Sequence, residues 1–156
     1  MITRRAGVAA DEDCASWATS PGVRSRMQLQ KSRDTGPELR LRRALHARGL
    51  RFRVHRQLLP GLRRRADIVF GPAKVVVDVR GCYWHGCPQH YRLATSNEQY
   101  WHPKIAGNQT RDAETQELLE GMGWLVVVVW EHEPTEEAAE HVRSLVLARR
   151  HARTHR

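Results

Sequence analysis

Residues 74–90 of this chain read KVVVDVRGCYWHGCPQH. The first part, Lys74 to Val79, is rich in valine and has the length of a strand buried in a sheet. The stretch from Gly81 to His90 contains two thiols, two imidazoles and two adjacent aromatic rings. Thiolate and neutral imidazole are the usual ligands of a tetrahedral zinc ion. The sequence therefore predicts a buried strand that leads directly into a metal-binding loop.

The composition predicts a single globular domain with a polyanionic partner. The chain has 156 residues, of which 40% are hydrophobic, and its 26 Lys and Arg against 17 Asp and Glu give a net charge of +9. Arginine supplies nearly all of this positive charge, and its planar guanidinium suits phosphate groups and base edges. We therefore expect contact with nucleic acid; the plainer alternative is a basic protein from an arginine-rich genome.

The sequence contains no recognisable export or membrane signal. There is no run of about 18 apolar residues, and no apolar segment follows the basic start, so we expect neither a membrane span nor a signal peptide. The cysteines, Cys14, Cys82 and Cys87, form an odd and sparse set, which indicates a reducing compartment. We expect a cytoplasmic, nucleoid-associated protein of a prokaryotic cell.

The pattern of apolar and polar residues predicts an α/β domain at residues 24–148. It follows a lead at 1–23 that we expect to be disordered, and it precedes a basic tail at 149–156 that we expect to fray. Capping signals and apolar periodicity predict helices at 37–49, 103–120 and from 135 onward. Apolar runs predict strands at 51–58, 66–70, 74–79 and 124–130. This order implies a mixed sheet flanked by helices.

Four residues form a candidate Cys2His2 zinc site. Cys82, Cys87 and His90 lie in the loop, whereas His132 follows the strand predicted at 124–130. If that strand pairs in parallel with the strand at 74–79, their carboxyl ends coincide and His132 can complete the site. A structural zinc ion would then stabilise a loop that is otherwise too polar to pack. The alternative, ordinary cysteines beside surface histidines, stays open at this point.

Two carboxylates mark a second candidate metal site. Asp67 opens one strand and Asp78 lies near the end of the next, so a hairpin would bring them together. Their oxygens, with the Val79 carbonyl as a third ligand, suit Mg²⁺, which polarises a phosphodiester and acidifies a bound water. Arg80 points to the same face as Asp78 and would stabilise the charge of a transition state. The alternative is that both aspartates are structural.

The spacing from Asp67 to Arg80 resembles the PD-(D/E)xK pattern of nucleases, with Ala66 for proline and Arg80 for lysine. His85 is a candidate general base, and Asp112 would hold the other nitrogen of its ring. His85 could instead be a spare zinc ligand or a phosphate contact. Glu38, at the start of a helix, is expected chiefly to interact with the helix dipole, with water on the metal as a second partner.

Several motifs in order resemble the very short patch repair (Vsr) endonucleases. The similarity runs from about Arg24 to Glu133. It comprises Ser25-Arg26-Met27, Arg33-Asp34-Thr35 with Glu38, Leu59-Pro60-Gly61 with Asp67, Gly81 to His85, Tyr100-Trp101, Lys104-Ile105 with Asn108, Arg111 and Asp112, and Gly123-Trp124 with Val129-Trp130-Glu131. Their order and spacing are more specific than any single motif. The resemblance implies a restriction-endonuclease-like fold with a structural zinc ion, here on Cys82, Cys87, His90 and His132.

The resemblance also implies a Mg²⁺-dependent enzyme that nicks double-stranded DNA on the 5′ side of the T in a T:G mismatch. Asp67 and the Val79 carbonyl would hold Mg²⁺, His85 and Asp112 would be the general-base pair, and Glu38 would be a supporting acid. The family's wedge, which enters the base stack at the mismatch, falls on Met27, Tyr83 and Trp84. Mismatch-repair proteins are candidate partners. We expect a monomer, since nicking needs one active site.

Some positions depart from the family pattern. Tyr83 stands where Phe is common, and Asp78 and Arg80 stand where the family has an apolar residue and a histidine. The metal site therefore looks more like that of ordinary restriction nucleases, while His90 and His132 stand where Cys ligands are also used. Two alternatives stay open: a nuclease acting on matched or otherwise damaged DNA, and a zinc-stabilised module that binds distorted DNA without cutting.

Overall fold

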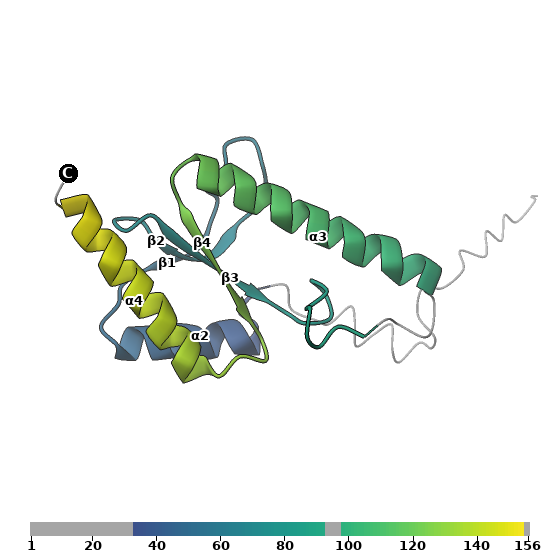
Figure 1. Ribbon diagram of the computed structural model, residues 1–156, viewed down its shortest axis with the longest axis horizontal. Coiled ribbons are helices and arrows are strands. Elements are labelled where there is room, and N and C mark those ends of the chain that lie inside the picture. Colours follow the sequence, from purple (N-terminus) through teal and green to yellow (C-terminus); the bar gives the residue numbers. More distant parts are fainter. Residues whose placement is uncertain (1–32, 93–97, 155–156) are drawn as a thin grey trace, which may run out of the picture.

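The computed structural model describes residues 33–92 and 98–154, which form three layers (Figure 1). Helices α2 (Gly36–Ala47) and α4 (Thr135–Thr154) cover one face of a four-stranded sheet, and α3 (Glu98–Gly121) lies on the other face. The strands are β1 (Arg53–Arg56), β2 (Ala66–Phe70), β3 (Val75–Arg80) and β4 (Leu125–Trp130). The predicted α/β class, a mixed sheet flanked by helices, is confirmed.

The pairing of the strands sets the position of every loop at the sheet's edge. The order is β1-β2-β3-β4, with antiparallel pairs except for β3 and β4, which are parallel. Val75 lies opposite Leu125 and Arg80 lies opposite Trp130, so the two parallel strands end side by side. Parallel pairing of these two strands was predicted as the condition for bringing His132 to the loop. That pairing is confirmed.

Helix α2 begins where the sequence provides a capping box. The Thr35 hydroxyl accepts the Glu38 N–H at 3.5 Å, and the Glu38 carboxylate accepts the Thr35 N–H at 3.5 Å. These reciprocal bonds satisfy N–H groups that the start of a helix leaves without intrahelical partners. Leu41 and Leu45 then bury one face of the helix in the core. Glu38 is consequently fixed in a buried position beside the sheet.

Alternation along the strands divides the apolar core between the two faces of the sheet. The larger cluster, under α2 and α4, includes Ile68, Phe70, Val75, Val77, Val127 and Val142. The smaller cluster, under α3, is made of Leu59, Val69, Val76 and Leu119. Successive strand residues point to opposite faces, so Val79 packs with the larger cluster while Asp78 and Arg80 share the α3 face with Val76.

Helix α3 is longer than predicted. It begins at Glu98, not near Pro103, and it includes Trp101, which precedes the predicted start. Proline cannot donate a main-chain hydrogen bond. So close to the first residue of a helix only one such bond is lost, and the loss costs least there. Trp101 is only 5% exposed, and burial of its large ring stabilises the additional turn.

The predicted ends of two other elements are also wrong. Strand β1 spans Arg53–Arg56, shorter than the predicted 51–58, and α4 continues to Thr154 where we expected a frayed tail. Arg149 explains part of this extension. Its Nε donates to the Ala73 carbonyl at 3.1 Å and its Nη2 to the Gly123 carbonyl at 2.7 Å. These bonds fasten the last turns of α4 to the turns that precede β3 and β4.

Some expectations concern parts of the chain outside 33–92 and 98–154. The predicted disorder of residues 1–23 and the position of Met27 fall there, so both stay predictions. Of the helices that the structure describes, none combines the length and apolarity needed to cross a membrane.

The bonds of Arg149 predict a loss of stability when this side chain is shortened. Arg149→Ala should lower the free energy of unfolding by about 1–2 kcal/mol, because two carbonyls lose a charged donor. Urea denaturation monitored by circular dichroism measures this. Arg153→Ala, at an exposed position of the same helix, is the control and should change stability by less than about 0.5 kcal/mol. Equal effects of the two changes would contradict the role given to Arg149.

Candidate active site and metal cluster

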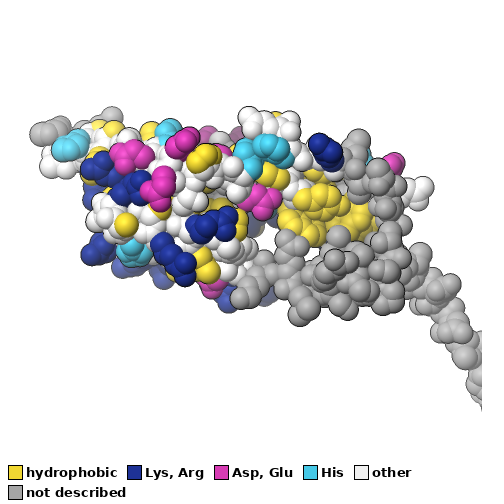
Figure 2. Space-filling model, turned by 90° about the horizontal axis from the view of Figure 1, so that it is seen from below, with side chains coloured by type: hydrophobic (Ala, Val, Ile, Leu, Met, Phe, Trp, Pro, Cys, Tyr) yellow, Lys and Arg dark blue, Asp and Glu magenta, His cyan; other side chains and the backbone are white. Residues whose placement is uncertain are grey.

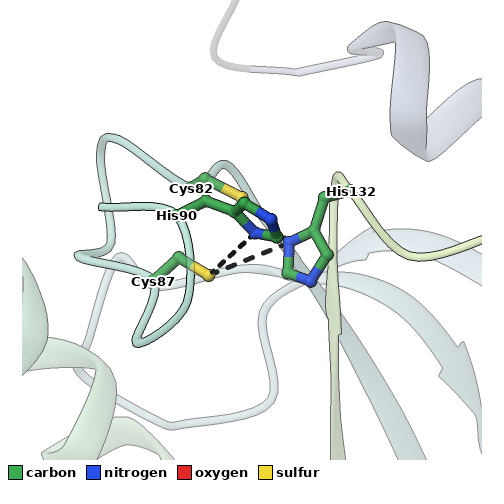
Figure 3. A group of neighbouring side chains, drawn as sticks. All are labelled: Cys82, Cys87, His90 and His132. Carbon is green, nitrogen blue, oxygen red and sulfur yellow. Dashed lines mark hydrogen bonds between the residues drawn. The ribbon is translucent and has the colours of Figure 1, made fainter. Parts of the chain in front are cut away.

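Two cysteines and two histidines converge at the shared end of β3 and β4 (Figure 3). Cys82, Cys87 and His90 come from the loop after β3, and His132 comes from the segment after β4. His132 Nδ1 lies 3.1 Å from Cys82 Sγ and 3.8 Å from Cys87 Sγ, and His90 Nδ1 lies 4.0 Å from Cys87 Sγ. All four predicted ligands are therefore brought together.

The spacing of these atoms suits a tetrahedral metal ion. Metal–sulfur bonds of about 2.3 Å and metal–nitrogen bonds of about 2.0–2.1 Å place tetrahedral ligands about 3.3–3.8 Å apart. The cluster brackets this range, and all four candidate ligand atoms lie within 4.8 Å of one another. Burial and the neighbouring Cys87 raise the pKa of the Cys82 thiol to about 11. Binding of a cation would therefore require displacement of a proton.

A carboxylate outside the cluster holds the loop in place. The Cys82 N–H donates to Glu131 Oε1 at 2.6 Å, and the Glu131 N–H donates to the Arg80 carbonyl at 2.9 Å. Glu131 thus ties the start of the loop to the end of β4. Sequence patterns assign Glu131 no role beyond its place in a family motif, because its partner is 49 residues away.

Three of the predicted acidic residues, Glu38, Asp67 and Asp78, border one cleft between α2 and the end of the sheet. This α2-side cleft has a volume of about 840 Å³, and its lining includes Glu38, Asp67, Asp78, Val79, Trp84 and His85. Asp67 Oδ2 accepts the Val79 N–H at 2.9 Å. Burial raises the pKa of Asp67 to about 7, and the charges of Asp78 and Glu38 add to the shift. Burial is thus the main reason why Asp67 resists ionisation, and the neighbouring carboxylates contribute less.

Asp78 and His85 are linked by a chain of polar contacts. Arg80 Nε lies 2.8 Å from Asp78 Oδ2 and 3.8 Å from Asp112 Oδ2. The same Asp112 oxygen lies 2.6 Å from His85 Nδ1. Asp112 is thus placed where it can fix the tautomer of His85 and leave Nε2 free for chemistry. Arg80, predicted to act on a transition state, has its Nε committed to two carboxylates.

Glu38 is held by a buried arginine that the sequence did not single out. Arg42 Nη2 lies 2.6 Å from Glu38 Oε2, Arg42 Nη1 lies 2.5 Å from Asp34 Oδ1, and the Arg42 residue is 9% exposed. His55 Nε2 lies 3.1 Å from both Arg42 Nη2 and Asp34 Oδ1. Asp34, Glu38 and His55 have the spacing of a metal site, yet the guanidinium already supplies the positive charge. The i,i+4 spacing of Glu38 and Arg42 was the available signal.

The aromatic pair in the loop is packed against other rings. Tyr83 and Trp84 contact each other edge to face at 5.3 Å between centroids. Both also contact Trp101 of α3, at 5.7 Å and 5.6 Å. The two rings are half-buried. Figure 2 shows a compact hydrophobic patch at this end of the molecule, away from the mixed charges over α2 and α4.

Helix α3 holds the loop through two hydrogen bonds from its side chains to loop carbonyls. Asn108 Nδ2 donates to the Trp84 carbonyl at 2.8 Å, and Gln109 Nε2 donates to the Gly86 carbonyl at 3.4 Å. Gly86 has φ +60, a conformation that favours glycine. These contacts fix the backbone on both sides of His85. No periodic pattern predicts them, because each joins a polar side chain to a distant carbonyl.

Comparison with known proteins identifies relatives over most of the chain. Residues 19–92 match the family model "DNA mismatch endonuclease Vsr". The type II nicking enzyme V.NaeI of Lentzea aerocolonigenes is 43% identical over 118 residues, covering 74% of this chain and 71% of that protein. V.XorIIP of Xanthomonas oryzae pv. oryzae is 42% identical over 75% of this chain and 85% of its own length. The DNA mismatch endonuclease Vsr of Escherichia coli K12 is 35% identical, over 67% and 66%.

These matches, together with the carboxylates and His85 in the α2-side cleft, define the class of protein as a DNA endonuclease. The chain belongs to the DNA mismatch endonuclease Vsr family. The family resemblance recognised from the ordered motifs is thereby confirmed.

The raised pKa of Asp67 predicts a specific pH dependence of stability. A carboxyl whose pKa is about 7 when folded and ordinary when unfolded stabilises the fold at low pH, and that contribution is lost as pH rises through about 7. In EDTA, Asp67→Asn should therefore melt at about the same temperature as the unmodified protein near pH 4, and higher by about 5 °C at pH 8. Parallel melting curves across this range would contradict the assignment.

Proposed function

We propose that this enzyme nicks one strand of duplex DNA on the 5′ side of the T in a T:G mismatch, and so starts very short patch repair. The observation that carries the proposal is the shared cleft, in which Asp67, His85 and Trp84 lie together. Metal-assisted hydrolysis needs the carboxylate and the base, and recognition of a weakened base step needs an aromatic ring beside them. Names of the relatives support mismatch and nicking activities.

His85 and Asp112 form the proposed general-base pair. Asp112 binds Nδ1 of the ring at 2.6 Å, so Nε2 is the nitrogen that accepts a proton from the attacking water. Asn108 and Gln109 hold the backbone on either side of His85, which limits movement of the ring. Arg80 balances the charges of Asp78 and Asp112. Its role in this arrangement is therefore to position the two carboxylates, and a contact with DNA is secondary.

The surroundings of Asp67 fit a hard divalent cation. Its carboxylate is raised in pKa by burial and by two neighbouring carboxylates, and a cation would relieve that repulsion. Asp67, Asp78 and the Val79 carbonyl would hold Mg²⁺. Glu38, which is fixed by its ion pair with Arg42, would be a supporting acid beside them. When bound, Mg²⁺ polarises the phosphodiester and lowers the pKa of a water. Asp67 on β2 beside Asp78-Val79-Arg80 on β3 supports a restriction-endonuclease-like fold.

A zinc ion fits the cluster of Cys82, Cys87, His90 and His132, because the ligand types and spacing suit tetrahedral zinc. Such an ion would brace the loop that carries Tyr83, Trp84 and His85. In the proposed reaction Tyr83 and Trp84, with Met27, enter the base stack at the mismatch. We expect a monomer, and mismatch-repair proteins remain candidate partners.

The proposal predicts strand-specific cutting that depends on Asp67. A labelled duplex with one T:G pair, incubated with Mg²⁺, should be nicked 5′ of the T, whereas a fully paired duplex or added EDTA should prevent cutting. Asp67→Asn should slow nicking about a thousandfold, since loss of a metal ligand removes several kcal/mol of transition-state stabilisation. Its affinity for the mismatched duplex should stay within a few fold.

The exposed Glu137→Gln, a matched removal of one carboxylate on α4, is the control and should keep full activity. Equal cutting of the paired duplex would favour a nuclease for matched DNA. Binding without any cutting would favour a non-catalytic module.

The zinc assignment predicts a loss of metal and stability when one ligand is removed. His132→Ala should bring the bound zinc, measured by mass spectrometry of purified protein, well below one ion per chain. The melting temperature should fall by several degrees, because metal binding contributes folding free energy. His141→Ala, which removes an exposed histidine of α4, should change neither quantity. A full zinc content in the His132 variant would show that another residue completes the site.

A further inference from the structure

The loop between β1 and β2 carries three consecutive arginines, Arg63, Arg64 and Arg65. They line a groove of about 340 Å³ on the α3 face of the sheet, and Arg111 of α3 also borders it. The lining of this α3-side groove includes Asp78, Arg80, His85 and Asp112 as well. The arginines and the proposed catalytic residues therefore share one continuous surface.

The loop is fixed on the body of the protein. Leu59 is buried, and Leu58 and Leu62 pack beside it on the small core cluster under α3. Arg64 fastens the loop to α3, since its Nη2 lies 2.8 Å from Glu114 Oε2 and its Nη1 lies 2.8 Å from Thr115 Oγ1. Arg63 and Arg65, on either side of Arg64, are exposed. The position of the loop is therefore set by the packing of these leucines and by the bonds of Arg64.

Positive charge in the groove is only partly balanced. Within the described parts of the chain, Arg64 is the member of the run that pairs with a carboxylate. Arg65 Nη1 donates to the His55 carbonyl at 3.3 Å and Arg111 Nη1 donates to Asn108 Oδ1 at 3.3 Å, both of them neutral acceptors. Guanidinium groups held near one another repel, and an anion between them relieves the repulsion. Their planar forks match the oxygens of a phosphate.

We propose that Arg63, Arg65 and Arg111 bind backbone phosphates of the DNA next to the one that is cut. This assignment rests on DNA being the substrate, and it names the part of the site that holds the flanking strand. His85 and Asp112 line the same groove, so a strand lying along it passes from the proposed cutting site to the arginines. Such contacts fix the strand's register on the enzyme and carry no sequence information.

The proposal is tested by the salt dependence of binding. Each phosphate contact contributes about 0.9 to the slope of log Kd against log salt concentration. The double variant Arg63→Ala, Arg65→Ala should therefore lower that slope by about 2 and weaken binding about tenfold or more at low salt. Fluorescence anisotropy of labelled T:G and fully paired duplexes, in EDTA and about 50–200 mM NaCl, measures both.

Two further variants make the result decisive. The double variant Arg63→Lys, Arg65→Lys keeps the charge and should restore most of the slope. Arg143→Ala removes one charge from α4, across the sheet, and should leave the slope unchanged. An unaltered slope in the folded double-alanine variant, or an equal loss in the Arg143 variant, would overturn the proposal. Equal losses of affinity for both duplexes would support the phosphate contacts even if the enzyme showed no T:G preference. The proposal of phosphate contacts and the proposal of mismatch-specific nicking can therefore fail independently.

Discussion

Parallel pairing of β3 with β4 is the constraint on which the rest of the site depends. In the observed register Arg80 lies opposite Trp130, so the loop after β3 and the segment after β4 begin at the same place. Glu131 and His132 then meet Cys82 directly. A slip of one residue would turn every side chain of β3 to the other face. Asp78 and Arg80 would enter the apolar core, and Val79 would replace them beside Asp112.

The proposed site is bordered by recesses on both sides of the sheet. Asp67 and Glu38 lie toward α2, whereas Asp112 comes from α3, and Asp78, Arg80 and His85 border both recesses. The carboxylates on the two sides are each balanced by a nearly buried arginine, Arg42 on one and Arg80 on the other. Since unpaired buried charges are costly, these arginines permit several acids to lie close together, as the proposed Mg²⁺ site would require.

Much of the architecture follows from local patterns in the sequence. The valine-rich runs define β3 and β4, and the Cys82–His90 spacing predicts three of the four residues of the cluster. His132 was added by reasoning about which strands are neighbours. The start of α3 was missed because its buried residues, such as Trp101 and Ile105, are too few to form a periodic stripe. Arg42, Glu131 and Arg149 were missed because their roles depend on specific contacts, and for Glu131 and Arg149 the partners are distant.

Packing of the aromatic pair bears directly on the proposed mismatch specificity. Tyr83 and Trp84 rest edge to face on Trp101, and each such contact is worth about 0.5–1.5 kcal/mol. Rings that enter a base stack must give up this packing, while stacking on a base returns about 1–3 kcal/mol. The remaining cost is the opening of the base step, which is smallest at a mismatch. The stacking gain exceeds the packing loss by at most a few kcal/mol. In the proposed mechanism the stability of the base step would therefore decide whether insertion occurs, which would favour a weakened T:G step over a paired one.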